Sequence, residues 1–201
     1  MSKYAIILAG GKGTRLKPYT VALPKALVPI GDFPILEIII KQLAHQGFER
    51  ISLTVNHQAD IIKAYFGDGR KWNVKIDYSF EDKPLGTMGP LTIIPDLPDD
   101  FLVMNGDVLT NLNYHDFYEY HIQHKNLFTV SGYKRTINSE FGVLEIGKNN
   151  QLTDFKEKPL IHYNVSMGIY MGNREILKFI PRDLHFGFDQ LMLKLIELDK
   201  P

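Results

Sequence analysis

A short glycine-rich loop followed by basic residues is the stretch of this sequence best suited to chemistry. Gly10, Gly11 and Gly13 follow an apolar run, and Arg15 and Lys25 come soon afterwards. A glycine turn leaving a strand exposes backbone N–H groups, and nearby cations favour a negative ligand. The loop therefore predicts a polyphosphate site, with a tight turn carrying solvated lysines as the alternative.

An aspartate after a later apolar run offers a second kind of chemistry. Asp107 follows Gly106, directly after the apolar segment Phe101–Asn105. A carboxylate in this place suits Mg²⁺, which takes oxygen ligands and usually shares substrate phosphates. The alternative is a turn aspartate that caps local N–H groups.

A glutamate before a Pro-Leu-Gly-Thr stretch suggests how a base could be recognised. Glu81 lies just before Pro84–Thr87. A carboxylate facing guanine can accept hydrogen bonds from both N1–H and N2–H₂, which argues for GTP. The alternative is a solvated loop residue beside Asp82 and Lys83.

Two familiar phosphate loops are excluded by spacing. A Walker A loop needs a Gly-Lys-Ser/Thr ending, but Gly13 follows Lys12 here, and Ile6 occupies the upstream glycine position. A G-x-G-x-x-G fingerprint starting at Gly11 needs glycine where the chain has Leu16. A dinucleotide-dependent oxidoreductase is therefore disfavoured.

The elements that must position these residues alternate between strand and helix patterns along the first 133 residues. Strands are predicted by apolar or alternating runs, and helices by apolar residues at helical spacing. The predicted strands are 4–9, 51–55, 74–80, 101–105 and 127–133, and the predicted helices are 34–46, 58–66, 86–94 and 114–124. This order predicts an α/β, doubly wound, mostly parallel sheet that binds ligands beyond the carboxyl ends of its strands.

The pattern changes after about residue 136. A hairpin is predicted over 141–146 and 151–155, a strand over 165–171, and helices over 174–180 and 188–198. We expect a smaller lobe against the same sheet, within a single domain covering 1–201. Asp96, Asp99 and Asp100 are interpreted as solvated loop residues, and His121 and His124 as an exposed pair on one helix.

Composition limits the classes of function. The 201 residues carry 23 Lys+Arg and 23 Asp+Glu, a balance that disfavours broad nucleic-acid binding. Cysteine is absent, which excludes disulfides and thiolate chemistry and suits a cytoplasmic protein. No apolar run is long enough to cross a bilayer, so we expect no membrane partner. A homo-oligomer is compatible with the sequence.

Several ordered motifs together resemble the sugar-1-phosphate nucleotidyltransferases, or sugar-nucleotide pyrophosphorylases. The chain contains L-A-G-G-x-G-T-R-L from Leu8, P-K-x-L-x-P-I from Pro24, P-L-G-T-x-G-P-L from Pro84, then N-G-D, F-G-V, F-x-E-K-P and G-I-Y. The set looks closest to mannose-1-phosphate guanylyltransferase-like members. The resemblance implies a Rossmann-like nucleotidyltransferase domain, with nucleotide binding in 1–135 and sugar-phosphate binding in 136–201.

The resemblance also implies roles for individual residues. Nucleotide-binding residues would be Leu8, Ala9, Gly10, Gly11, Gly13, Thr14, Arg15, Lys25, Glu81, Pro84, Leu85, Gly86, Thr87 and Gly106. Sugar-phosphate-binding residues would be Gly142, Glu157, Lys158 and Ser166, the last standing where many members have Asn. Arg15, Lys25, Lys158 and Mg²⁺ on Asp107 would carry catalysis.

The implied reaction joins an NTP and a sugar 1-phosphate to give an NDP-sugar and pyrophosphate. GTP with mannose-1-phosphate or a related sugar is the first expectation, and UTP or dTTP with glucose-1-phosphate is the alternative. Family members continue into a segment with a second metal-binding Asp, which has no counterpart here. We therefore expect a truncated chain or an incomplete metal site, and a non-catalytic nucleotide-sugar binding module is the rival from another class.

Overall fold

The computed structural model describes residues 2–11, 13–56 and 58–200, with the side chain of Arg15 excepted. The strands are Lys3–Leu8 (β1), Pro29–Ile30 (β2), Phe33–Pro34 (β3), Phe48–Val55 (β4), Lys75–Phe80 (β5), Asp100–Asn105 (β6), Phe128–Asn138 (β7), Val143–Ile146 (β8), Leu152–Lys156 (β9) and Leu160–Asn173 (β10). The α-helices are Ile35–His45 (α1), Ala59–Phe66 (α2), Tyr114–His124 (α3) and Phe188–Glu197 (α4). Short 3-10 helices cover Thr14–Leu16, Tyr19–Val21, Lys25–Leu27, Arg70–Trp72, Gly89–Ile93, Lys148–Asn150 and Arg174–Phe179.

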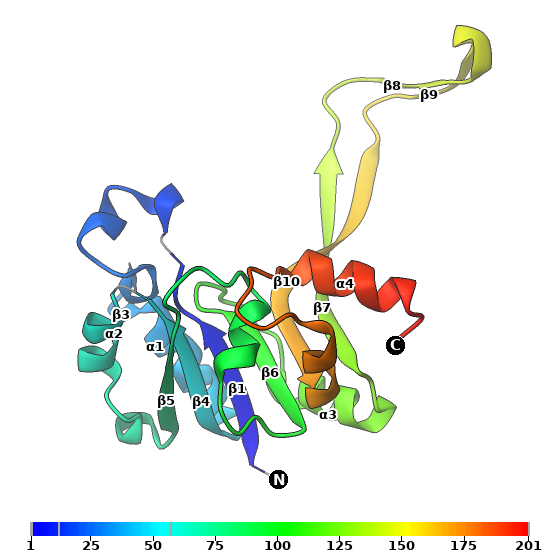
Figure 1. The fold of residues 1–201 in the computed structure, drawn as a ribbon. Coiled ribbons are helices and arrows are strands. Elements are labelled where there is room, and N and C mark those ends of the chain that lie inside the picture. Colours follow the sequence, from blue (N-terminus) through cyan, green and yellow to red (C-terminus); the bar gives the residue numbers. More distant parts are fainter. Residues whose placement is uncertain (1, 12, 57, 201) are drawn as a thin grey trace. The chain divides into compact units, whose positions relative to one another are not determined.

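A six-stranded sheet with the order β5-β4-β1-β6-β10-β7 organises the fold (Figure 1). β1 pairs in parallel with both β4 and β6, and β5 pairs in parallel with β4. β10 pairs with β6 in the antiparallel direction. The prediction of an α/β, mostly parallel sheet is confirmed.

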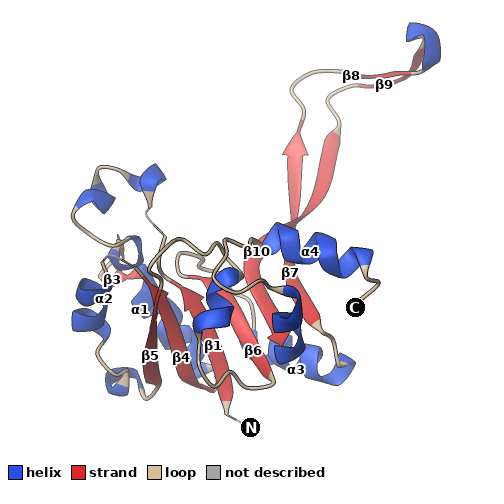
Figure 2. Cartoon of the chain, viewed as in Figure 1, coloured by secondary structure: helices blue, strands red, loops and turns tan. Residues whose placement is uncertain are grey.

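Helices cover both faces of this sheet (Figure 2). Ala5 and Ile7 of β1 pack into the core shared with α1, α2 and α3. Tyr4 and Ile6, which alternate with them, pack into the core formed with α4 and two 3-10 helices. Because both faces of the strand are covered, its sequence is an unbroken apolar run and not an alternating one.

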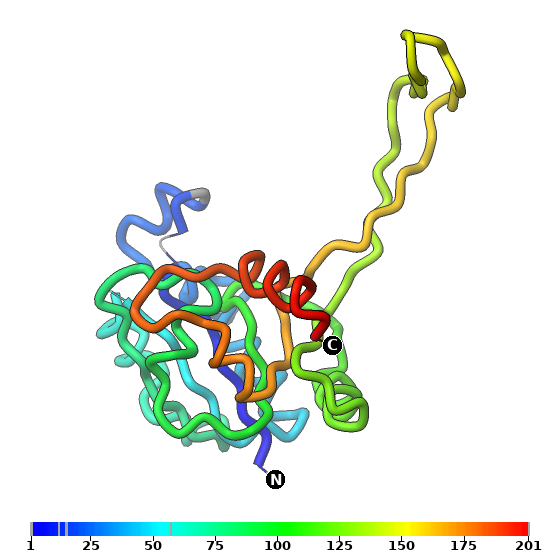
Figure 3. The backbone as a smooth tube through the Cα atoms, turned by 45° about the vertical axis from the view of Figure 1, so that its right-hand side comes forward, coloured from blue at the N-terminus to red at the C-terminus, as the bar shows by residue number. Residues whose placement is uncertain are grey.

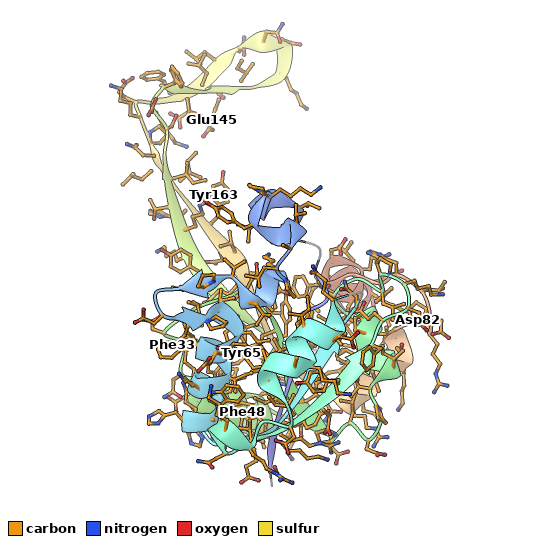
Figure 4. The ribbon with its side chains drawn as sticks, turned by 90° about the vertical axis from the view of Figure 1, so that its left-hand side faces the viewer. Phe33, Phe48, Tyr65, Asp82, Glu145 and Tyr163 are labelled. Carbon is orange, nitrogen blue, oxygen red and sulfur yellow. The ribbon has the colours of Figure 1, made fainter. Side chains whose placement is uncertain are left out.

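The chain divides into two compact units, each described by itself. Residues 1–130 and 168–201 form the first unit, and residues 131–167 form the second. In the second unit, β8 and β9 pair as an antiparallel ribbon, with Leu144 opposite Phe155 and Glu145 opposite Asp154. Figure 4 labels Glu145 on this ribbon. The assignment of nucleotide and sugar binding to separate parts of the chain stays a prediction.

Several elements differ from the sequence-based expectation. The helices predicted over 86–94 and 174–180 are the 3-10 helices Gly89–Ile93 and Arg174–Phe179. Pro90 lies in the first of these and lacks the N–H that an α-helix would use beyond its first turn. β7 and β10 extend farther than predicted, since their outer residues are exposed and give no apolar pattern.

His121 is fully buried, so the predicted exposed pair with His124 is wrong. Its Nδ1 lies 2.8 Å from the Thr129 hydroxyl, and its Nε2 lies 3.3 Å from an Asp100 carboxylate oxygen. Burial lowers the pKa of His121, against the opposing effect of Asp100. Asp100 begins β6 and also accepts a hydrogen bond from Asn173, so it is a structural residue and not a solvated loop aspartate.

None of the helices in the described part of the chain combines the length and the apolar character that crossing a membrane requires.

Candidate functional site

A cavity of about 870 Å³ lies in the first unit, where loops follow the carboxyl ends of β1, β4, β5 and β6. This is the edge at which parallel sheets place their ligands. Most of the predicted nucleotide-binding residues line it: Leu8, Ala9, Gly10, Gly11, Thr14, Lys25, Glu81, Pro84, Gly86, Thr87 and Gly106, together with Asp107.

The glycine-rich loop after β1 is folded onto itself by a hydrogen bond. Gly13 has φ +59°, and its carbonyl oxygen accepts a hydrogen bond of 2.8 Å from the Thr20 hydroxyl. A Cβ on Gly13 would lie 2.7 Å from Thr20 Cγ2, so both the backbone angle and the space require glycine. Thr14 begins a 3-10 helix and lines the cavity, while the Arg15 side chain lies outside the described residues.

The strand ends beneath the loop are fixed by backbone hydrogen bonds. The Ala9 N–H donates to the Thr54 carbonyl at 2.9 Å, and the Gly106 N–H donates to the Leu8 carbonyl at 3.0 Å. A Cβ on Gly106 would lie 3.0 Å from that same Leu8 oxygen. The glycine lets β6 turn away beside β1, and this brings Asp107 to the cavity wall.

Lys25 and Asp107 form an ion pair inside the cavity. Their side chains are 26% and 36% exposed, so solvent reaches both groups. Lys25 begins a 3-10 helix after Pro24, whereas Asp107 follows β6. The pair joins the cation and the carboxylate that the sequence predicted for phosphate and metal binding.

At another part of the cavity, Glu81 is partly buried beside a glycine turn. Its Oε2 accepts a hydrogen bond of 3.2 Å from the Leu85 N–H. Burial raises the pKa of the Glu81 carboxyl, and the Leu85 N–H opposes that shift. Leu85 itself is 3% exposed and packs inward, while Gly86, with φ +82°, lines the cavity.

The described residues are suited to hold a magnesium ion only if a phosphate ligand supplies part of its coordination shell. Across residues 2–11, 13–56 and 58–200, no three His, Asp or Glu side chains gather as a metal site. Asp107 offers one carboxylate after β6, while the carboxylates of Glu81 and Asp82, which also line the cavity, come from the chain after β5. Mg²⁺ commonly uses one or two carboxylates and completes its shell with substrate phosphates and water, so the carboxylate of Asp107 is suitable chemistry for a metal that a phosphate ligand would help to hold.

The predicted sugar-phosphate residues belong to the second unit. A Cβ on Gly142 would lie 2.6 Å from the Phe155 ring and 3.2 Å from a Glu157 carboxylate oxygen, so Gly142 and Glu157 are neighbours. Lys158 has φ +42° in the turn between β9 and β10, and its side chain is exposed. Ser166 lies on β10.

Some cavity-lining residues were not predicted from the sequence. They are Lys17, Thr20, Ala26, Asn56, Asp82, Lys83, Asn105 and His185. Asn56 directly follows β4, and its side chain donates a hydrogen bond to the Gly10 carbonyl. Its place as a polar residue at the end of a predicted strand could have identified it from the sequence. Asp82, labelled in Figure 4, was considered from the sequence only as a neighbour of Glu81. His185 carries no comparable signal, because its place depends on the fold.

Comparison with known protein families gives one match over most of the chain. The model of the family described as nucleotidyl transferase matches residues 4–189.

Two curated relatives resemble most of this sequence. A UTP–glucose-1-phosphate uridylyltransferase of Synechocystis is 33% identical, over 98% of this chain and 56% of the relative. A mannose-1-phosphate guanyltransferase of Aspergillus oryzae is 36% identical, over 88% of this chain and 51% of the relative. The chain thus spans about half the length of the curated relatives it matches.

Solved structures share the fold. The crystal structure of HddC from Yersinia pseudotuberculosis complexed with GMP-PN is 29% identical, with a TM-score of 0.69 over 92% of this chain and 83% of that one. A putative glucose-1-phosphate thymidylyltransferase from Bacillus anthracis is 24% identical with a TM-score of 0.71, covers 89% of this chain and 74% of its own, and supports the fold alone.

Proposed function

Because the chain belongs to the nucleotidyl transferase family, we propose that it transfers a nucleotidyl group from an NTP to a sugar 1-phosphate. The products are an NDP-sugar and pyrophosphate. One observation carries the proposal: a single cavity is lined by a glycine-rich loop, the cation of Lys25, the carboxylate of Asp107 and the half-buried Glu81.

The proposed nucleotide is GTP, and the proposed sugar phosphate is mannose-1-phosphate or a related sugar. Glu81 supports the base, because an ionised carboxylate accepts both donors that guanine presents on its N1–N2 edge. The Aspergillus relative bears the name of a mannose-1-phosphate guanyltransferase. The Synechocystis relative keeps UTP with glucose-1-phosphate as the second candidate pair.

The proposed chemistry needs no protein nucleophile. An oxygen of the sugar phosphate attacks the α-phosphorus of the NTP, a new P–O bond forms, and the bond to the β-phosphate oxygen breaks to release pyrophosphate. Catalysis then consists of positioning and charge neutralisation. Mg²⁺ would supply further neutralisation of the phosphates when held by Asp107.

Each basic residue has a proposed part in that positioning. Lys25 would leave Asp107 and bind a phosphate of the NTP, and Arg15 would hold phosphate oxygens through its planar fork of donors. Lys158 would bind the sugar phosphate, with Glu157, Gly142 and Ser166 at the sugar hydroxyls. The backbone of Leu8–Gly11 and Gly86 would contact the nucleoside closely, since glycine leaves room for a flat ring.

Pyrophosphate release tests the proposal. The purified chain is incubated with Mg²⁺ and each of GTP, UTP, dTTP and ATP, paired in turn with mannose-1-phosphate and glucose-1-phosphate. We expect release only with a matched pair, with GTP and mannose-1-phosphate fastest. Binding of nucleotide or NDP-sugar without release at any pairing would instead support a non-catalytic binding module.

A further inference from the structure

One side chain in the cavity wall comes from a part of the chain remote from the loops that follow β1, β4, β5 and β6. His185 lies between the 3-10 helix Arg174–Phe179 and α4, about a hundred residues after Glu81. Its side chain is exposed and faces the cavity. The proposed function gives it no part.

The segment that carries His185 is firmly attached to the loop after β5. The Phe186 N–H donates to the Leu85 carbonyl at 2.9 Å, and the Met88 N–H donates to the Phe186 carbonyl at 2.9 Å. The Phe188 N–H donates to the Thr87 hydroxyl at 2.7 Å. In Figure 3 the orange-red chain before α4 runs beside the green chain after β5. Phe186 is itself buried in the core, so the backbone at His185 has little freedom.

The imidazole of His185 stands against the glycine that the base is expected to contact. A Cβ on Gly86 would lie 3.2 Å from His185 Nε2. The neighbouring Leu85 N–H holds the Glu81 carboxylate. The turn Leu85–Gly86 therefore lies beside both an acceptor, Glu81, and a ring nitrogen able to donate, that of His185.

Glu81 and His185, an acceptor and a donor lining the same cavity, are chemically suited to a base that presents both donors and acceptors. Guanine presents donors at N1 and N2 and acceptors at O6 and N7, whereas uracil has no acceptor equivalent to N7. We propose that His185 determines specificity for the nucleotide by donating a hydrogen bond to the O6/N7 edge of the guanine base. This inference rests on the proposed function. Glu81 binds the donor edge of the same base.

Nucleotide binding measured by calorimetry, with Mg²⁺ and without sugar phosphate, tests this assignment. The proteins are the unchanged chain, His185→Ala, His185→Gln, which keeps a donor, and His45→Ala, an exposed histidine at the end of α1, as the matched control. The probes are GTP, 7-deaza-GTP and UTP. Thermal unfolding of each variant checks that the fold is intact.

We expect His185→Ala to weaken GTP binding about tenfold, the scale of one hydrogen bond, and UTP binding less than about twofold. His185→Gln should recover part of the lost GTP affinity. The unchanged chain should bind 7-deaza-GTP more weakly than GTP, and His185→Ala should lose less affinity for 7-deaza-GTP than for GTP. Equal losses for GTP and UTP, or no loss at all, would overturn the assignment of His185 while nucleotidyl transfer still stood. An unchanged chain that binds no NTP would overturn the proposed function as well.

Discussion

The two units of the molecule hold their candidate site residues by different means. In the first unit, residues such as Asp107 and Gly106 follow strands whose side chains are buried on both faces. In the second unit, all of whose residues 131–167 are described, Ser131 alone is buried. There the ribbon is held by its own ladder and by the ion pair of Lys156 on β9 with Glu145 on β8.

That difference determines how rigidly each unit holds its candidate site residues. The backbone at the end of a strand packed on both faces is held in place by the close-packed core around it, so the backbone position of Asp107 resists change. A two-stranded ribbon with exposed apolar side chains such as Leu144 and Phe155 has little core of its own and is marginal alone. We therefore expect substitutions in the first unit to change stability and binding, and exposed substitutions in the second to change stability little.

The largest expected effect is the loss of turnover in Asp107→Asn. The amide keeps the shape but removes the charge proposed to hold Mg²⁺, so we expect the rate of pyrophosphate release to fall by about 10²–10³. Lys25 loses its ion-pair partner in this variant, so metal-free GTP binding should be retained or tightened. The control is Asp154→Asn on the exposed ribbon, expected to change the rate by less than about twofold. Full activity of Asp107→Asn would rule out the metal assignment.

A matched pair of leucine truncations compares the two units directly. Leu53 on β4 is fully buried, and its replacement by Ala should lower the free energy of unfolding by about 3 kcal/mol through lost contacts and a cavity. Leu144 on β8 is 55% exposed, so the same change should cost less than about 0.5 kcal/mol. Urea denaturation followed by circular dichroism measures both, and similar losses would show that the ribbon is not as weakly packed as described.

A matched pair of glycine substitutions tests the turn beside Glu81. Gly86→Ala places a methyl group 2.7 Å from the Phe186 carbonyl oxygen at φ +82°, and we expect a loss of about 1–3 kcal/mol together with weaker GTP binding. Gly132→Ala in β7 has nothing within 4 Å of the new methyl group and should be neutral. Thermal unfolding and GTP titration of the two variants give the comparison. If Gly86→Ala changes neither the stability nor GTP binding, the backbone of residues 85–89 shifts to accommodate the methyl group at little cost.

The smallest expected effect is a pH dependence of GTP binding. Burial raises the pKa of Glu81, so its carboxylate takes up a proton at a higher pH than an ordinary glutamate does. Protonation removes the acceptor for guanine, so GTP affinity should fall as pH drops through that raised pKa, and UTP affinity should fall less. Glu81→Gln should bind GTP more weakly at neutral pH and without this slope. An identical slope in the Gln variant would assign the titration to another group.

Much of the fold followed from local pattern. The apolar run at Tyr4–Ala9 and the helical spacing over 34–46 predicted β1 and α1 to within about one residue, since burial on both faces or on one stripe leaves a clear periodicity. The outer parts of β7 and β10 were missed because their residues are exposed. His121 was misjudged because its fully buried site beside Asp100 is set by tertiary packing, which a polar residue in a helical pattern does not reveal.

The sequence by itself determined the alternation of strands and helices, the glycine loop with its cations, and the acidic residues at strand ends. Each of these features depends only on the types of residues that are adjacent in the chain. Only the tertiary structure decided that Lys25 pairs with Asp107, that Glu81 is partly buried beside Leu85, and that His185 reaches the same cavity. Lys25 and Asp107 are 82 positions apart, and His185 lies 104 residues after Glu81. The hydrogen bond between Glu81 and Leu85 spans four residues, but the burial of Glu81 depends on the packing around it. These arrangements depend on how the sheet is ordered and packed, and no local pattern encodes that order.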